Sequence, residues 1–156
     1  MIALQIPGMG SLDWHHLVLD VNGTLTVDGA LAPGVAERIR ILAGRVRVHL
    51  LTADTRGTVA GIAQDLGVAW ARVQRGQEAE QKRDYVDGLG AAAVIAVGNG
   101  NNDALMLSAA GLGIVVIGRE GAATRAIMAA DLAVHDITDA LDMLLDPTRL
   151  LSTLRC

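Results

Sequence analysis

Short apolar runs alternate with helix-like segments of about ten residues along this chain, and this alternation constrains the fold more than any other feature. Most of the runs are nearly continuous in apolar residues, which is typical of strands that helices cover on both faces of a sheet. A helix between each pair of strands gives βαβ units with parallel strands. The alternation therefore predicts an α/β fold, a three-layer Rossmann-like parallel sheet with helices on both faces.

The bounds of the expected elements follow from the apolar runs and their Gly, Pro and Thr punctuation. The expected strands are His16–Leu19, Val46–Leu51, Val68–Val73, Ala92–Val97, Leu112–Ile117 and Leu132–Val134. The expected helices are Gly34–Ala43, Thr55–Leu66, Glu78–Leu89, Asn101–Ala109, Ala122–Ala130 and Ile137–Leu145. Pro33 favours a helix start, Thr55 can cap the second helix and Gly67 can end it. The 156 residues fit a single domain, 1–156, large enough to bury a core without disulfides.

Composition argues against several classes of function. The formal net charge is −4 and no basic run is present, so we expect no nucleic-acid partner. The longest apolar stretches, such as Ala91–Val97, are too short to span a membrane. The chain starts without a positively charged segment and has one cysteine, which indicates neither a secretory signal nor an internal disulfide. We therefore expect a cytoplasmic protein without a membrane partner.

Polar residues follow three of the predicted strands. Asp20, Thr52 and the segment Gly98–Asp103 each come directly after an apolar run. Ligands of parallel α/β sheets bind beyond the carboxyl ends of the strands, so we expect these residues at one edge of the sheet. A carboxylate such as Asp20 can attack a phosphoryl group, and Gly23 permits a tight turn whose amides could face an anion.

The other chemical candidates have weaker signals. Thr52 precedes a predicted helix N-terminus and can bind phosphate, and Lys82 can neutralise a phosphoryl group. The loop Gly98–Asp103 can approach a metal–phosphate closely, with Asp103 as a ligand or a supporting acid. Each segment also has a purely structural explanation. Asp20 could simply end a strand, and Thr52 or Asp54 could be an ordinary helix cap. Lys82 could be a solvated helix charge, and Gly98–Asp103 a glycine turn.

Taken in order, these segments resemble the haloacid dehalogenase superfamily of aspartate-nucleophile phosphatases and phosphotransferases. They look most like the phosphorylation domain of P-type cation pumps, which carries Asp-Lys-Thr-Gly-Thr-Leu-Thr, Thr-Gly-Asp, a lysine and Gly-Asp-Gly-x-Asn-Asp. The matching stretches here are Asp20–Thr26, Thr52–Asp54, Lys82 and Gly98–Asp103. The likeness covers most of Leu17–Val134 and implies the fold of that superfamily.

Three departures from the family pattern bear on activity. Asn22 stands where the phosphatases usually carry the aspartate that acts as general acid and base, and an amide cannot donate that proton at neutral pH. Asn99 replaces the aspartate that ordinarily ligates Mg²⁺, so metal affinity should fall. Val27–Leu51 leaves no room for the ATP-binding domain of the pumps, and Asp54 to Lys82 leaves none for a cap.

The resemblance implies a capless, Mg²⁺-dependent phosphatase that acts on a small phosphorylated substrate through an aspartyl-phosphate at Asp20. The implied catalytic residues are Asp20, Asn22 and Lys82. Phosphate would be held by Thr52, Ala53, Lys82 and Gly23, and Mg²⁺ by Asp20, Asn22, Asn99 and Asp103. An open site and an apolar-rich surface also favour a homo-oligomer. The alternative is a catalytically impaired binding or regulatory module, which the two Asp-to-Asn replacements favour.

Overall fold

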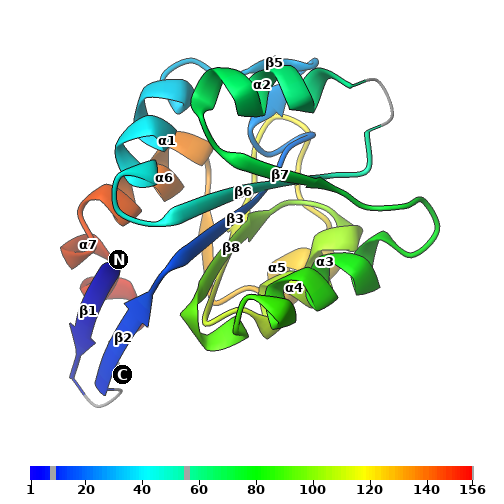
Figure 1. Ribbon diagram of the computed structural model, residues 1–156. Coiled ribbons are helices and arrows are strands. Elements are labelled where there is room, and N and C mark those ends of the chain that lie inside the picture. The colour runs from blue at the N-terminus through cyan, green and yellow to red at the C-terminus, as the bar shows by residue number, and fades with distance from the viewer. Residues whose placement is uncertain (8–9, 55–56, 156) are drawn as a thin grey trace.

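Six parallel strands form the central sheet, in the order β10-β9-β8-β3-β6-β7 (Figure 1). The computed structural model describes residues 1–7, 10–54 and 57–155. The strands of the sheet are β3 (His16–Asp20), β6 (Arg47–Thr52), β7 (Ala69–Arg72), β8 (Val94–Gly98), β9 (Leu112–Val116) and β10 (Leu132–Val134). This is the predicted α/β fold, and each predicted strand begins and ends within two residues of the observed one.

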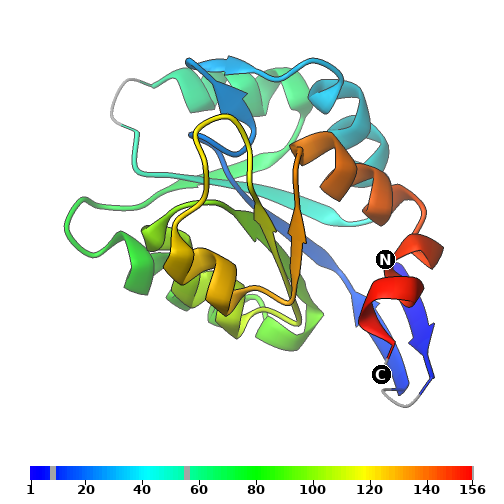
Figure 2. The ribbon, with the colours of Figure 1, turned by 180° about the vertical axis from the view of Figure 1, so that it is seen from behind.

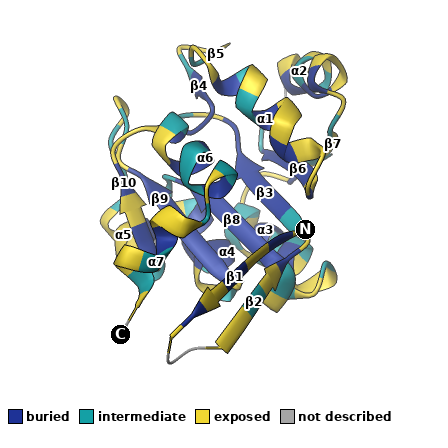
Figure 3. Ribbon diagram, turned by 90° about the vertical axis from the view of Figure 1, so that its left-hand side faces the viewer, coloured by how far each residue is buried: buried dark blue, intermediate teal, exposed yellow. Residues whose placement is uncertain are grey.

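Helices cover both faces of the sheet, as the apolar strands predict (Figures 1 and 2). One face carries α1 (Val35–Ala43), α2 (Thr58–Leu66) and α6 (Ile137–Leu145), and the other carries α3 (Glu78–Gly88), α4 (Ala104–Ala109) and α5 (Thr124–Ala129). The side chains of successive β3 residues pack on opposite faces of the sheet, because strand side chains alternate in direction. Leu17 and Leu19 join the core under α1 and α6, whereas Val18 joins the core under α3 and α4. Figure 3 shows the central strands buried along most of their length, with partial exposure at the amino end of β3.

Some helix ends differ from the predicted ones. The structure places a 3₁₀ turn at Asn101–Asp103 before α4, and another at Ala91–Ala93 before β8. Helix α1 begins two residues after Pro33, behind Gly34, and α2 begins at Thr58. The predicted cap Thr55 lies outside the described residues. Gly67 ends α2 in a left-handed conformation, as predicted.

Three further elements lie outside the central sheet and its covering helices. An antiparallel hairpin pairs β1 (Ile2–Ile6) with β2 (Gly10–Trp14), and α7 (Thr148–Leu154) packs against β1. A second, very short hairpin pairs β4 (Thr26–Val27) with β5 (Ala30–Leu31). Strand β2 leads into the amino end of β3, so the first hairpin lies at the end of the sheet opposite Asp20 (Figure 1).

The connections between strands are short. Between β3 and β6 the chain forms only the β4–β5 hairpin and α1, and the described residues between β6 and α3 form only α2 and β7. No cap domain is therefore present in these described connections, as the sequence predicts. No helix of the described residues is both long enough and apolar enough to cross a bilayer.

Candidate active site

The predicted polar residues meet at the carboxyl edge of the sheet. Strand β3 pairs with β6 on one side and with β8 on the other, so the chain changes its winding direction here, which is where α/β sheets bind ligands. Thr24 Oγ1 lies 3.0 Å from Asp20 Oδ2 and 3.1 Å from Asn99 Oδ1. On the β6 side, Asn22 Nδ2 donates to Thr52 Oγ1 over 3.4 Å. The expectation that Asp20, Thr52 and Asn99 share one edge is confirmed.

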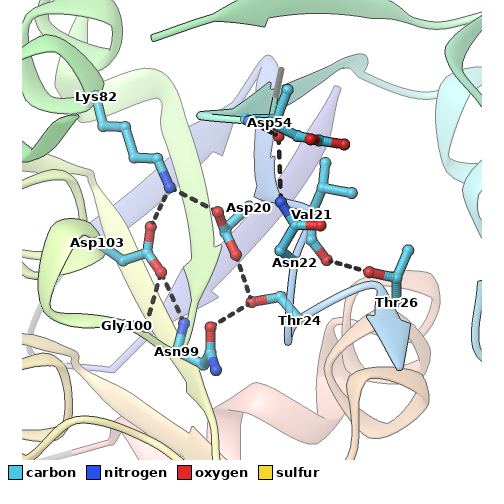
Figure 4. Close-up of polar contacts among 11 residues, drawn as sticks. Asp20, Val21, Asn22, Thr24, Thr26, Asp54, Lys82, Asn99, Gly100 and Asp103 are labelled. Atoms are coloured by element: carbon cyan, nitrogen blue, oxygen red, sulfur yellow. Dashed lines mark hydrogen bonds and ion pairs between the residues drawn. The ribbon is translucent and has the colours of Figure 1, made fainter. Parts of the chain in front are cut away.

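Lys82 joins the two carboxylates of the site. Its Nζ donates to Asp20 Oδ1 and to Asp103 Oδ1, each over 2.6 Å (Figure 4). Lys82 and Asp103 are completely buried and Asp20 is 6% exposed. Burial alone lowers the pKa of Lys82, but the two carboxylates outweigh it and the pKa is raised. Lys82 is therefore a buried cation in an ion-pair network, and its explanation as a solvated helix charge is wrong.

Asp20 has an unusually high pKa for an aspartate. Burial is the largest cause and the charge of Asp103 adds to it, while Lys82 and Thr24 oppose the shift; together they raise the pKa of Asp20 to about 6. Near neutral pH the carboxylate is mostly ionised. It is also only weakly solvated, which suits a nucleophile that must approach an anionic phosphoryl group.

Asp103 is fully engaged by the protein. Its Oδ2 accepts the backbone N–H groups of Asn99 and Gly100, over 2.9 and 2.8 Å, while its Oδ1 accepts from Lys82. A Cβ on Gly98 would lie 2.5 Å from Asp103 Cγ, so glycine allows this close approach to the end of β8. Through these contacts Asp103 fixes the position of Lys82 and of the backbone at Asn99 and Gly100. Its predicted role at the metal stays a prediction, and the geometry favours support of the other ligands.

The turn after Asp20 is built around one carbonyl group. The Val21 oxygen accepts the N–H groups of Thr24, Leu25 and Thr26, over 3.3, 2.9 and 3.0 Å. Gly23 has a φ of +78°, a conformation that favours glycine, and its N–H donates to Thr26 O over 3.2 Å. The predicted phosphate contact from Gly23 therefore competes with a bond inside the turn and stays a prediction.

Asn22 and Ala53, which neighbour Asp20 and Thr52 in the two motifs, line a solvent-open cavity of about 490 Å³. The cavity is also lined by Thr26 and Arg75. The Thr52 oxygen accepts from the Asp54 N–H over 2.9 Å and from Asn22, contacts that do not use its own hydrogen. Thr52 is buried, but its hydroxyl hydrogen is not used by these contacts and remains available to a phosphoryl oxygen.

The donors at this edge suit a hard cation. Mg²⁺ prefers oxygen ligands and keeps several waters, and the site offers the Asp20 carboxylate, the Asn99 amide oxygen and the Asn22 carbonyl. Among the described residues, no three His, Cys, Asp or Glu side chains gather as a metal cluster. A cation here would therefore depend on amide and carbonyl oxygens as well as on Asp20.

Mg²⁺ binding is expected to weaken as the pH falls below about 6. A proton and the metal compete for Asp20, whose pKa is raised to about 6, so affinity should be constant above that pH and fall by up to about 10-fold per pH unit below it. Calorimetric titration at pH 5, 6, 7 and 8 measures this dependence. Affinity that is unchanged from pH 8 to pH 5 would exclude Asp20 as a ligand.

Two side chains of the site, Thr24 and Glu120, are not among the site residues that the sequence predicts. Thr24 lies within the motif Asp20–Thr26, so the motif itself could have indicated it. Glu120 Oε2 lies 2.8 Å from the point where a Cβ on Gly23 would stand. Glu120 follows β9 in a turn between two glycines, and no pattern in the sequence connects that turn with Asp20.

Sequence comparison finds relatives of different lengths, and no family model matches the chain. An uncharacterised protein of Methanocaldococcus jannaschii is 56% identical over 62 residues, which are 40% of this chain and 67% of that protein. A soluble P-type ATPase-like phosphatase of the same organism is 27% identical over 127 residues, 80% of this chain. The match spans 46% of that phosphatase, so the chain covers less than half of its length.

Several solved structures share the fold. A zinc-transporting PIB-type ATPase in the E2.Pi state is 30% identical with a TM-score of 0.62, covering 80% of this chain and 20% of that chain. The cobalt-bound deoxy-D-mannose-octulosonate 8-phosphate phosphatase of Haemophilus influenzae has a TM-score of 0.68 at 16% identity, covering 92% and 94% of the two chains. The 3-deoxy-D-manno-octulosonate 8-phosphate phosphatase of Moraxella catarrhalis, in complex with magnesium, phosphate and KDO, has a TM-score of 0.66 at 15% identity, covering 89% of this chain and 90% of that chain.

Proposed function

Because this chain is a haloacid dehalogenase (HAD) superfamily protein, by its fold and by its similarity to P-type ATPases, we propose that it is a Mg²⁺-dependent phosphatase that forms an aspartyl-phosphate at Asp20. One observation carries the proposal: the Asp20 carboxylate lies at the carboxyl end of the central strand, held between Lys82 and Thr24. Lys82 is completely buried and donates to both Asp20 and Asp103, and a charged network of this kind at a strand end supports a role in the transfer of an anionic group.

The chemistry assigned to the chain has two steps. In the first, an Asp20 oxygen attacks phosphorus and the bond to the leaving-group oxygen breaks, so the phosphoryl group moves to Asp20. In the second, water attacks phosphorus and the bond between phosphorus and the Asp20 oxygen breaks, which releases inorganic phosphate, gives up the proton of the water to solvent and regenerates the Asp20 carboxylate. Lys82 and Thr52 bind the phosphoryl oxygens and offset the charge that they carry in the transition state. A bound Mg²⁺ supplies further positive charge to those oxygens.

Asn22 limits which substrates can react quickly. A positioned general acid contributes about 10²–10⁴-fold to a rate, and an amide cannot supply it. The loss is large for alkyl phosphates, whose leaving group needs a proton, and small for acyl or nitrophenyl phosphates. We therefore expect a slow or selective phosphatase, with a phospho-enzyme that accumulates.

Asn22→Asp is expected to raise kcat/KM for an alkyl phosphate by up to about 100-fold, because it restores a carboxyl group near the leaving group. Asn22 is exposed and almost isosteric with aspartate, so the turn should survive the change. Nitrophenyl phosphate should gain much less in the attack step. The measurement compares both esters in wild type and variant at saturating Mg²⁺.

Thermal unfolding of Asn22→Asp serves as the control for folding. A folded variant that gains activity with neither ester would argue against an enzyme. Together with an absence of Mg²⁺-dependent turnover in wild type, that result would favour the alternative, a HAD-like module that binds a phosphate or a partner.

A further inference from the structure

Glu120 places a carboxylate beside the Asn99 side of the site. Its Oε2 and the Asn99 Nδ2 both lie 2.8 Å from the point where a Cβ on Gly23 would stand. The two side chains therefore border the same small space above the turn after Asp20. Within the described part of the chain, Glu120 forms no ion pair and its side chain is exposed, so its charge is not neutralised by a neighbouring cation.

The turn that carries Glu120 is hydrogen-bonded to the side chain of Asn99. Glu120 lies in a turn that the Gly121 N–H closes on Gly118 O over 2.9 Å, in the loop between β9 and α5 (Figure 2). Asn99 Nδ2 donates to Gly121 O over 3.2 Å, and the Ala123 N–H donates to Asn99 O over 2.8 Å. An aspartate at position 99 would place an oxygen against the Gly121 carbonyl. An amide at position 99 is therefore compatible with the observed position of the turn that carries Glu120, whereas an ionised aspartate would be repelled by the Gly121 carbonyl.

The other charged groups of the site leave only one negative charge to face a divalent cation. Asp20 and Asp103 carry two negative charges, and Lys82, which contacts both, cancels one of them. Asp103 is occupied by Lys82 and two backbone N–H groups, so a divalent cation would meet the single charge of Asp20 and the neutral oxygen of Asn99. A second carboxylate on the Asn99 side would raise the affinity for such a cation considerably.

We propose that Glu120 supplies the second negative charge of the Mg²⁺ site, in place of the charge that Asn99 lacks. Mg²⁺ in proteins keeps several of its waters, so a carboxylate that accepts from a metal-bound water contributes without direct ligation. The inference rests on the proposed function, because it assigns a residue to the cation of that site. It also explains how a site with an amide at position 99 can still hold a cation.

The test is calorimetric titration of Mg²⁺ in the presence of a beryllofluoride mimic of the phosphoryl group. Glu120→Gln is expected to weaken Mg²⁺ binding roughly 10-fold, because a charge facing a divalent ion across partly solvated space is lost. Asp13→Asn is the matched control: it removes one negative charge from exposed β2, at the opposite end of the sheet. Its Mg²⁺ affinity should equal that of wild type.

A second variant tests whether the effect is one of charge. Asn99→Asp combined with Glu120→Gln returns one carboxylate to the site and should bring the affinity to within about threefold of wild type. A Glu120→Gln protein with wild-type affinity, or a double variant as weak as the single one, would overturn the inference and leave the phosphatase proposal standing. If wild type itself binds no Mg²⁺ with the mimic, the proposed function fails and the inference fails with it.

Discussion

Asp20→Asn is expected to abolish Mg²⁺-dependent turnover of nitrophenyl phosphate, with a loss of at least about 10³-fold, because no other carboxylate lies at the end of the central strand, where the proposed nucleophile stands. Asn22 and Asn99 are amides, Thr24 and Thr52 are hydroxyl groups, and Asp103 is occupied by Lys82 and the loop. The measurement is the initial rate with and without Mg²⁺. Turnover that survives in a folded Asp20→Asn protein would place the chemistry elsewhere.

The same substitution is expected to stabilise the protein at neutral pH. The pKa of Asp20 rises from 3.8 to about 6 on folding, so the ionised carboxylate is disfavoured in the folded state, and a difference of one in pKa corresponds to about 1.4 kcal/mol. The stabilisation of the folded state by protonated Asp20 is fully present below pH 3.8, the pKa in the unfolded chain. It is lost as the pH rises through about 6, the pKa in the folded protein. At pH 8 Asp20→Asn should therefore be more stable by about 1–3 kcal/mol, with a smaller gain at pH 4.

Urea unfolding at pH 4 and pH 8 measures both values. A variant less stable than wild type at pH 8 would contradict the raised pKa of Asp20. Replacing a catalytic carboxylate is expected to lower activity and raise stability, whereas replacing a structural carboxylate is expected to lower stability.

Lys82→Met is expected to lower the free energy of unfolding by about 3–5 kcal/mol, because it leaves two buried carboxylates without their cation. Methionine fills a similar space, so the loss reports the charge rather than a cavity. Activity should fall as well, since the residue is assigned to the phosphoryl oxygens. Urea denaturation at pH 8 measures the stability change.

The neighbouring residue offers a matched control. Arg83 lies on the same helix, is half-exposed and pairs with Asp84 and Asp87 at the surface, where ion pairs contribute at most about 1 kcal/mol. Arg83→Met should therefore cost little. If Lys82→Met costs no more than Arg83→Met, the buried network is not charged as we describe it. Adding Asp20→Asn to Lys82→Met should recover part of the loss, because one of the unpaired charges is removed.

The sheet could be predicted from the sequence because its strands are apolar on both faces. Leu132–Val134 and Ile137–Leu145 were predicted with their observed bounds, and the gathering of Asp20, Thr52 and Asn99 followed from the rule for parallel strands. The β1–β2 hairpin was missed although Ile2, Leu4 and Ile6 alternate with exposed residues, because a short alternating strand near a chain end has a weak signal.

The details of the site depend on contacts that local patterns do not contain. Lys82 alone resembles a solvated helix charge, and its burial follows from two carboxylates supplied by β3 and by the loop after β8. Glu120 lies beside Gly23 in a turn that accepts a hydrogen bond from the Asn99 amide, far away in the sequence. Such pairings across the sheet can be predicted only when the strand order is known.

That strand order also bears on how the chain folds. The earliest strand of the sheet, β3, is the central one: His16 pairs with Arg47 on one side and with Val94, much later in the sequence, on the other. Of the strands in this sheet, β3, β6 and β7 are synthesised first, and the β8 side of β3, with Leu17–Leu19 at its centre, stays unpaired until the chain has been made through Gly98. Exposed strand edges of this kind recruit other chains, and pairings so distant in sequence form slowly. The interval between β7 and β8 is therefore when a nascent chain is most prone to aggregation.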